Sequence, residues 1–245
     1  MHTADFYKRK FPRIGHLPWS KGRTADDIDA FITDFQHKEI IITEKLDGEN
    51  TVIGPNYYHA RSMDSGPAAW RTMIAALYAK ICSNIQPNMR ICGENMYAEH
   101  SIKYALKHPF YVFMITEGTT VLSWDDTVEI CEILDLPTVP VIARGKNLSY
   151  FDIHEGYYSN YNWGLRNHGQ TCEGYVIRNA KSFDESTFEH NYAKYVRENH
   201  LQTDEHWTKN WKPNNINTLN LDVRDIMIVE PYVKSSGPAK KTRSG

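Results

Sequence analysis

The chain of 245 residues lacks several features that would assign it to a class at once. It has four widely spaced cysteines and no C-x-x-C pair. Neither a zinc ribbon nor a disulfide framework is therefore indicated, and reduced thiols are expected. No apolar run approaches the length of a membrane span, and the N-terminal MHTADFYKRKFPR has no signal-peptide core. The sequence predicts a cytoplasmic protein that does not associate with a membrane.

Net charge is also nearly absent. The 28 Lys and Arg residues almost balance the 30 Asp and Glu residues, which leaves a formal charge of −2 at pH 7. This balance argues against a protein that holds nucleic acid by bulk charge, although a local basic groove stays possible. The hydrophobic fraction of 41% and the charged fraction of 24% are those of an ordinary globular protein. The length suffices for one large domain, with or without a small appendage.

Strand-like segments dominate the middle of the chain. Their β-branched and aromatic content predicts strands at residues 39–44, 50–54, 57–61, 89–94, 109–115, 138–143 and 174–178. Helical patterns fall at residues 24–35, 68–83, 125–134 and about 150–158, with Thr24 and Asp125 as N-caps. Strands in sequential runs with intervening helices favour an α+β fold with mostly antiparallel sheets over a doubly wound parallel sheet.

The composition of the chain changes after Arg197. Residues 198–220 are polar and contain two tryptophans, and LDVRDIMIV at 221–229 suits a closing strand or helix. We therefore expect a main domain over residues 1–197 and a short C-terminal extension over 198–233, packed on or beside it. The basic residues 234–245 are expected to be disordered.

The stretch EKLDGEN, residues 44–50, directly follows the apolar run Ile40–Ile42. Strands often end in polar turns, and Asp-Gly is a common turn pair. The lysine of this stretch could also serve as a nucleophile. A lysine amine attacks phosphorus only when it is neutral. Its unperturbed pKa is about 10.4. Burial beside other cations, or next to a metal, would lower the pKa of Lys45 and activate it.

Four further stretches follow in order along the chain. They are the strand-end pair Gly93-Glu94, the aromatic strand YVFMI at 111–115, the acid-led strand EGYVI at 173–177 and the cation-bearing AKYVR at 193–197. Seen singly, each acid is best explained as a strand-end residue, and Phe113 as a core residue. The ordered set with Lys45 is much more specific than any one member.

This ordered set resembles the covalent nucleotidyltransferase superfamily of ATP-dependent ligases and mRNA capping enzymes, whose motifs I, III, IIIa, IV and V match the five stretches. The resemblance is closer to RNA ligases of the phage T4 RNA ligase 2 type. Asn50 completes their K-x-x-G-x-N pattern, and Glu44 precedes the lysine as it does there. The 48 residues after Arg197 look too short for the OB domain of DNA ligases and capping enzymes.

The resemblance implies an ATP-grasp-like ligase adenylation (nucleotidyltransferase) domain without an OB domain, its mostly antiparallel sheets flanked by helices. It implies that Lys45 attacks the α-phosphorus of ATP and that Asp47 belongs to the catalytic loop. Lys194 would contact the phosphates. The family pattern has a second lysine where this chain has Val196, and we assign that part to Arg197.

The remaining implied roles concern nucleotide and metal. Glu94 would accept hydrogen bonds from the ribose, and Phe113 would stack on the adenine, with Tyr111 as the alternative. Arg61 would lie near the reacting phosphates. Glu44 would contact the adenine edge.

Glu173 would bind Mg²⁺ or Mn²⁺, because such ions prefer few protein oxygens together with water and phosphates. Asn50 would orient the activated 5′ end.

The function implied is an ATP-dependent RNA ligase that seals 5′-phosphate and 3′-hydroxyl RNA ends through lysyl-AMP and RNA-adenylate. Two alternatives stay open on the sequence. One is a DNA ligase or a GTP-dependent capping enzyme of the same superfamily. The other is an inactive RNA-binding relative.

Overall fold

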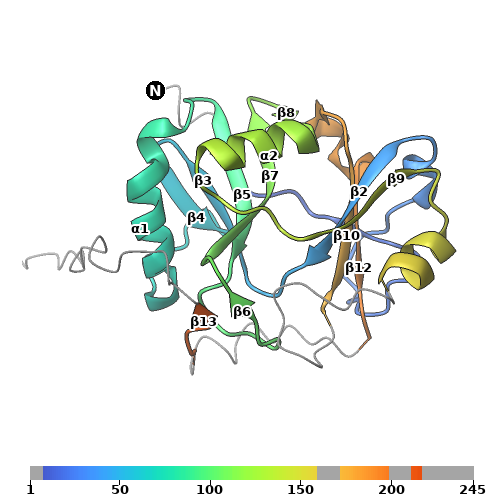
Figure 1. Ribbon diagram of the computed structural model, residues 1–245, viewed down its shortest axis with the longest axis horizontal. Coiled ribbons are helices and arrows are strands. Elements are labelled where there is room, and N and C mark those ends of the chain that lie inside the picture. The colour runs from blue at the N-terminus through green and yellow to red at the C-terminus, as the bar shows by residue number, and fades with distance from the viewer. Residues whose placement is uncertain (1–7, 159–171, 199–210, 217–245) are drawn as a thin grey trace, which may run out of the picture.

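Two β-sheets, each built almost entirely from antiparallel pairs, form the centre of the molecule (Figure 1). The computed structural model describes residues 8–158, 172–198 and 211–216. The first sheet has the order β1-β12-β10-β2-β9. Its strands are β1 (Gly15–His16), β2 (Glu39–Lys45), β9 (Val141–Lys146), β10 (Gly174–Asn179) and β12 (Tyr192–Val196).

The second sheet has the order β11-β8-β7-β5-β3-β4. Its strands are β3 (Glu49–Gly54), β4 (Tyr57–Ala60), β5 (Met89–Asn95), β7 (Phe110–Glu117), β8 (Thr120–Val121) and β11 (Phe183–Asp184). A small third sheet pairs β6 (Ala105–Leu106) with β13 (Asn215–Ile216). Only β1–β12 and β6–β13 are parallel among the pairs of named strands in the described residues, so the expected α+β fold is confirmed.

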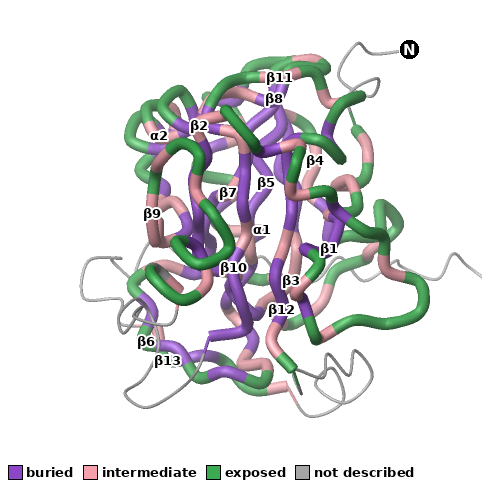
Figure 2. Tube along the Cα trace, turned by 90° about the vertical axis from the view of Figure 1, so that its right-hand side faces the viewer, coloured by how far each residue is buried: buried purple, intermediate pink, exposed green. Residues whose placement is uncertain are grey.

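Helices cover the outer faces of the two sheets. The helices α1 (Thr72–Ile81) and α2 (Trp124–Ile133) pack on the second sheet, where Ile74, Ile91 and Leu134 share one apolar cluster. A π-helical segment, Phe151–Tyr158, packs on the first sheet. Shorter 3₁₀ turns are Ile32–Phe35, Ala69–Arg71, Cys82–Asn84 and Glu185–His190. Buried residues follow the strands through the middle of the molecule, while most connections between them are exposed (Figure 2).

Strand β2 shows why the apolar run Ile40–Ile42 is continuous rather than alternating. Ile40 and Ile42 belong to the apolar cluster beneath the π-helical segment Phe151–Tyr158, and Ile41 belongs to the cluster between the sheets. All three side chains are at most 2% exposed. A central strand with both faces buried requires apolar residues at successive positions. This burial holds the strand that ends at Lys45.

The helix predicted at residues 24–35 is wrong except for the 3₁₀ turn in its last four residues. Thr24 caps no helix. Its N–H and hydroxyl donate to Asp27 Oδ2 at 2.8 and 3.1 Å, which closes a turn. The backbone around Asp29 then pairs with His16 as an isolated bridge. Extended pairing with a neighbouring segment therefore overrides the local helical pattern.

The other predicted helices are confirmed, with changes at their ends. α2 begins at Trp124, and its cap is Ser123, whose Oγ accepts from the Asp126 N–H at 3.1 Å, rather than Asp125. The strand predicted at 138–143 lies later, at Val141–Lys146. Pro140 precedes this strand and has no N–H to donate to a ladder. The segments 221–229 and 234–245 lie outside the described residues.

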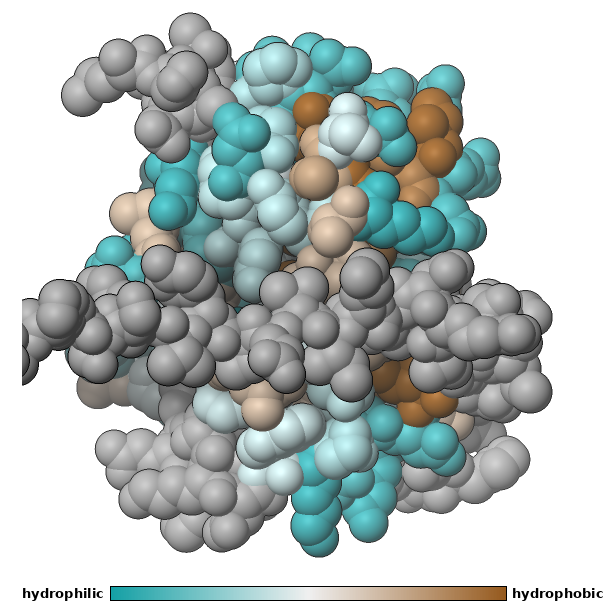
Figure 3. Space-filling view, turned by 90° about the vertical axis from the view of Figure 1, so that its left-hand side faces the viewer, coloured by the Kyte–Doolittle hydropathy of each residue, from teal (hydrophilic) through white to brown (hydrophobic). Residues whose placement is uncertain are grey.

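No helix within the described ranges is long and apolar enough to cross a membrane. Hydrophilic side chains cover most of the described surface on the face drawn in Figure 3, with apolar groups in smaller areas.

Candidate active site

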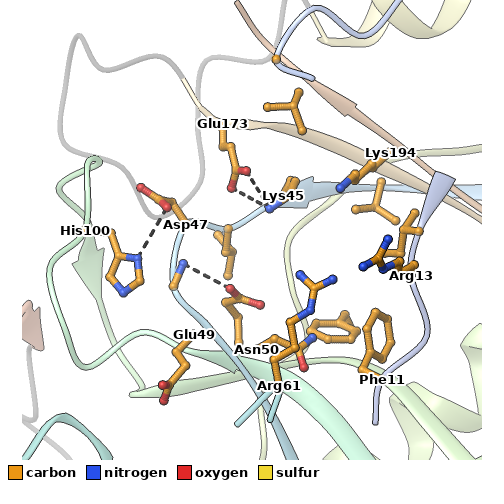
Figure 4. Close-up of a pocket in the computed structure, with 18 of the residues that line it drawn as sticks. Phe11, Arg13, Lys45, Asp47, Glu49, Asn50, Arg61, His100, Glu173 and Lys194 are labelled. Carbon is orange, nitrogen blue, oxygen red and sulfur yellow. Dashed lines mark hydrogen bonds and ion pairs between the residues drawn. The ribbon is translucent and has the colours of Figure 1, made fainter. Parts of the chain in front are cut away.

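An open cavity of about 1240 Å³ is lined by residues of both large sheets. It contains most of the side chains that the sequence singled out. Lys45, Glu173 and Lys194 enter it from the first sheet and its flanking residues, and Asn50, Glu94 and Phe113 enter it from the second sheet. Figure 4 shows Lys45 near the middle, with Glu173 above it and Lys194 to one side.

Three residues, Leu46–Gly48, carry the chain from the end of β2 in one sheet to the start of β3 in the other. Gly48 lies so close to β5 that a Cβ atom there would be 2.6 Å from the Asn95 carbonyl oxygen. Its N–H donates to Glu94 Oε1 at 3.2 Å. The Asp-Gly pair therefore does belong to a turn, and that turn joins the two walls of the cavity.

The ammonium group of Lys45 is held by one carboxylate. Its Nζ lies 2.7 Å from both Oε1 and Oε2 of Glu173. Gly174 pairs with Lys45 in the register of β10 with β2, so Glu173 stands beside the lysine at the start of its strand. The side chain of Glu173 is 1% exposed and that of Lys45 is 19% exposed. The pair is nearly dry but can be reached from the cavity.

The expectation that burial beside cations lowers the pKa of Lys45 is wrong. Burial does act to lower it, but the negative charges of Glu173, Glu94 and Asp47 together outweigh burial and raise the pKa. With these side chains around it, Lys45 is therefore charged at neutral pH.

The pKa values of two neighbouring groups, Glu94 and Lys194, are both shifted toward neutral pH, so each group is more easily uncharged. Desolvation, reinforced by the charges of Glu173 and Asp47, raises the pKa of Glu94 to about 8. Burial, followed by the charge of Lys45, lowers the pKa of Lys194 to about 8. Lys194 Nζ lies 3.9 Å from Asp27 Oδ1. Both groups are thus able to change protonation near neutral pH.

Asp47 holds a neighbouring loop. Its Oδ2 accepts from the N–H of Ser101 at 2.9 Å, the hydroxyl of Ser101 at 2.6 Å and the N–H of Ile102 at 3.2 Å. Its Oδ1 lies 3.7 Å from Nδ1 of His100 (Figure 4). With 2% exposure, Asp47 positions the loop at residues 100–102 relative to Lys45. Its catalytic role stays a prediction.

Arg197 does not line the cavity. Its Nε donates to the Cys172 carbonyl at 3.2 Å, and its N–H donates to the Glu173 carbonyl at 3.0 Å. In this arrangement it fixes the backbone that precedes β10. Its assignment as the second phosphate-binding cation stays a prediction and receives no support from this geometry.

The aromatic strand β7 distinguishes the two candidates for base stacking. Phe113 lines the cavity, whereas Tyr111 is 4% exposed and packs in the core between the sheets. The ring of Phe11 lies 5.1 Å from that of Phe113 at an interplanar angle of 72°. This end of the cavity is apolar and aromatic, as a purine requires.

The other nucleotide-binding candidates also line the cavity. Arg61 follows β4 and is exposed, while Glu44 is 1% exposed. Asn50 Oδ1 is buried without a hydrogen-bond partner among the described residues. A buried polar atom of this kind usually has a partner, so Asn50 is placed to receive a donor from a ligand.

Sequence reasoning missed several residues that line the cavity, most of them near the two ends of the chain. The lining also includes Phe11, Arg13, Arg23, Asp27, Trp70 and Lys212. Asp27 and Trp70 fall in segments predicted as helices, and the other four in segments with no predicted strand or helix, so no pattern marks them as neighbours of the cavity. Their approach to Lys45 depends on tertiary pairing. Within the described residues, no group of three or more His, Cys, Asp or Glu side chains forms a ready metal cage.

Comparison with solved structures shows that the fold is shared with RNA ligases. A mutant of Naegleria gruberi RNA ligase "with AMP and Mn" has a TM-score of 0.53 at 14% identity, covering 78% of this chain and 56% of that chain. Naegleria gruberi RNA ligase "with PPi" has a TM-score of 0.51 at 16% identity, with coverage of 76% and 58%. A putative ATP-dependent DNA ligase from Aquifex aeolicus gives 0.49 at 21% identity, with coverage of 78% and 50%.

The profile of the RNA ligase family matches residues 38–196, well over half of the chain. The chain belongs to this family. It spans only about half to six tenths of the length of the solved structures described above. No curated protein sequence gives a match.

The raised pKa of Glu94 predicts how stability depends on pH. Folding raises this pKa from its ordinary value to about 8, so the folded protein binds more protons than the unfolded chain between those values. The contribution of Glu94 to stability is therefore lost as pH rises toward 8. Glu94→Gln should be more stable than the parent at pH 8, by on the order of a few kcal/mol, and nearly equal to it at pH 4.5.

Urea denaturation at both pH values measures this difference. Glu117→Gln, at an exposed glutamate of β7, is the matched control and should show no pH-dependent gain. A stability difference for Glu94→Gln that does not vary with pH would contradict the prediction.

Proposed function

We propose that this chain is an ATP-dependent RNA ligase that joins a 5′-phosphate end to a 3′-hydroxyl end and acts in the cytoplasm. The observation that carries the proposal is the contact of Lys45 with Glu173, at 2.7 Å, inside a cavity that Glu94, Lys194 and Phe113 also line. Membership of the RNA ligase family supports the same reading.

In the first step the Nζ atom of Lys45 forms a bond with the α-phosphorus of ATP. The bond from that phosphorus to pyrophosphate breaks, and the amine loses a proton. AMP then passes from the lysine to the 5′-phosphate of an RNA strand. Finally a 3′-hydroxyl attacks that phosphate and AMP leaves. Negative charge develops on phosphate oxygens in every step, so the cations Lys194 and Arg61 have a stabilising role.

The nucleotide would place its base against Phe113 and its ribose toward Glu94. Because the pKa of Glu94 is about 8, its carboxyl can either accept or donate a hydrogen bond near neutral pH. Glu44, at the wall of the same cavity, would contact the edge of the base.

The residues present fit a divalent cation held with the help of the ATP phosphates. The nearly dry carboxylate of Glu173 supplies oxygen ligands, and Mg²⁺ or Mn²⁺ needs few from protein when phosphates and water complete the shell. Such an ion would offset the negative charge of Glu173 beside Lys45, which would lower the pKa of the amine, and it would neutralise charge on the phosphates. One of the similar structures described above, a mutant of Naegleria gruberi RNA ligase, is "with AMP and Mn".

Lys45→Ala should fold normally and take up no AMP, because the variant lacks the proposed nucleophile. The measurement uses labelled ATP or GTP with Mg²⁺, followed by denaturation and detection of label on the protein. Lys181→Ala, at an exposed lysine after β10, serves as the control and should label like the parent. Label retained by Lys45→Ala would place the nucleophile elsewhere. Label from GTP alone would indicate capping chemistry, and no label in the parent an inactive relative.

Glu173→Ala and Lys194→Ala should each slow adenylation by about a hundredfold or more, which is typical when a preorganised electrostatic contact is lost. Single-turnover formation of labelled protein gives the rate, and circular dichroism checks that both variants are folded. Parental rates in either variant would remove that residue from the site. Arg197→Ala, measured alongside, shows whether Arg197 acts on phosphate despite lying outside the cavity lining.

The choice of RNA over DNA can be tested on nicked duplexes that differ only in their terminal sugars. The parent should need ribonucleotides at the 3′-hydroxyl end, since the 2′-hydroxyl is the direct difference between the two polymers. Asn50→Ala should still form lysyl-AMP but should seal poorly, because its amide would orient the activated 5′ end. Single-turnover sealing of an all-DNA nick at the same rate as a nick with ribonucleotide ends would instead indicate a DNA ligase.

A further inference from the structure

The segment 211–216 lies beyond the residues matched by the family profile, yet it is bonded to the wall of the cavity. The side-chain amide of Asn214 donates to the carbonyls of Met96 and Ala98 at 2.8 and 3.0 Å, and its N–H donates to the Tyr97 carbonyl at 2.8 Å. Asn214 is 5% exposed. Together with the pairing of β13 and β6, these bonds give the segment a defined position.

The first residue of this segment packs among aromatic side chains. The ring of Trp211 lies 5.7 Å from that of Tyr97 and 6.3 Å from that of Trp70. Trp70 lines the cavity and is oriented by Glu49, whose Oε1 accepts from its Nε1 at 3.3 Å. Trp211 therefore fixes the segment against the rim of the cavity.

Lys212 is the exposed cation that this anchoring brings to the cavity. Its carbonyl accepts from the Glu99 N–H at 2.8 Å. The loop that follows Glu99 is in turn held by Asp47, two residues after Lys45. One backbone hydrogen bond and the bonds to the Asp47 carboxylate thus connect Lys212 to the turn that follows Lys45. Within the described part of the chain, its ammonium group makes no ion pair.

The place of this segment in the cavity indicates its ligand. Figure 4 shows His100 and Glu49 on one side of Lys45, with Phe11 and Arg13 on the other. The Phe11 side holds the aromatic residues assigned to the base. The loop that contains His100 also contains Glu99, the hydrogen-bond partner of Lys212, so Lys212 belongs to the opposite end. Once a nucleotide occupies the aromatic end, the polynucleotide must reach Lys45 from elsewhere.

We propose that the anchored segment 211–216 is part of the RNA-binding surface and that Lys212 binds a backbone phosphate of the RNA strand. This proposal rests on the proposed function. An ammonium group is suited to phosphate as a point charge, and such contacts hold a strand in place without reading its sequence. Asn214 and Trp211 act by positioning Lys212.

The test measures binding of a short, 5′-phosphorylated, single-stranded RNA to the full chain by fluorescence anisotropy across a salt series. Lys212→Ala should weaken binding several-fold. It should also lower the slope of log affinity against log salt by about 0.7, the value expected for one lost phosphate contact on a single strand. Lys212→Arg should restore both. Lys107→Ala is the matched control, because Lys107 is exposed just after β6 and does not line the cavity.

Adenylation by ATP without RNA is measured on the same preparations. A loss confined to RNA binding supports the phosphate contact. Parental affinity and slope in Lys212→Ala would overturn it, as would equal losses of adenylation and RNA binding. A parent protein that binds RNA but never forms lysyl-AMP would instead contradict the proposed ligase function, while the Lys212 comparison would still test the phosphate contact.

Discussion

The three-residue crossing between β2 and β3 is the constraint on which the site depends. On one side of it, pairing of β2 with β10 brings Glu173 to 2.7 Å from Lys45. On the other side, pairing of β3 with β5 places Glu94 beside Gly48, where no larger residue fits. A single turn thus sets the position of Lys45 and of the two carboxylates around it. The burial of β2 on both faces makes this turn a rigid one.

The site places buried carboxyl and ammonium groups close together, and their pKa values are shifted as a result. Carboxylates raise the pKa of Lys45, while desolvation shifts Glu94 and Lys194 toward their neutral forms. Such shifts are common where a protein prepares groups for chemistry. The same arrangement would become balanced when phosphates and a divalent cation enter, because they add charges of both signs. Binding of substrate and activation of Lys45 would then be coupled.

Much of the fold could be predicted from sequence because its signals are local. The apolar run before Lys45, the aromatic strand with Phe113 and the order of the motifs gave the strands and the pocket-lining residues. The helix predicted from Thr24 failed because backbone pairing with His16 is a long-range effect. The predicted direction of the Lys45 pKa shift was wrong for a similar reason, because the shift depends on carboxylates from three segments of the chain. Arg197 was assigned the part of a lysine that the family pattern has at the position of Val196, but its side chain bonds to backbone instead of lining the cavity.

The central claim is that Lys45 itself forms the covalent bond to AMP. The most direct measurement is mass spectrometry of the protein after incubation with ATP and Mg²⁺, first intact and then as peptides mapped under conditions that preserve a phosphoramidate. The account predicts that one AMP is added and that it is found on the peptide containing Lys45. AMP on a peptide that contains Lys194 or any other lysine, with none on Lys45, would contradict it.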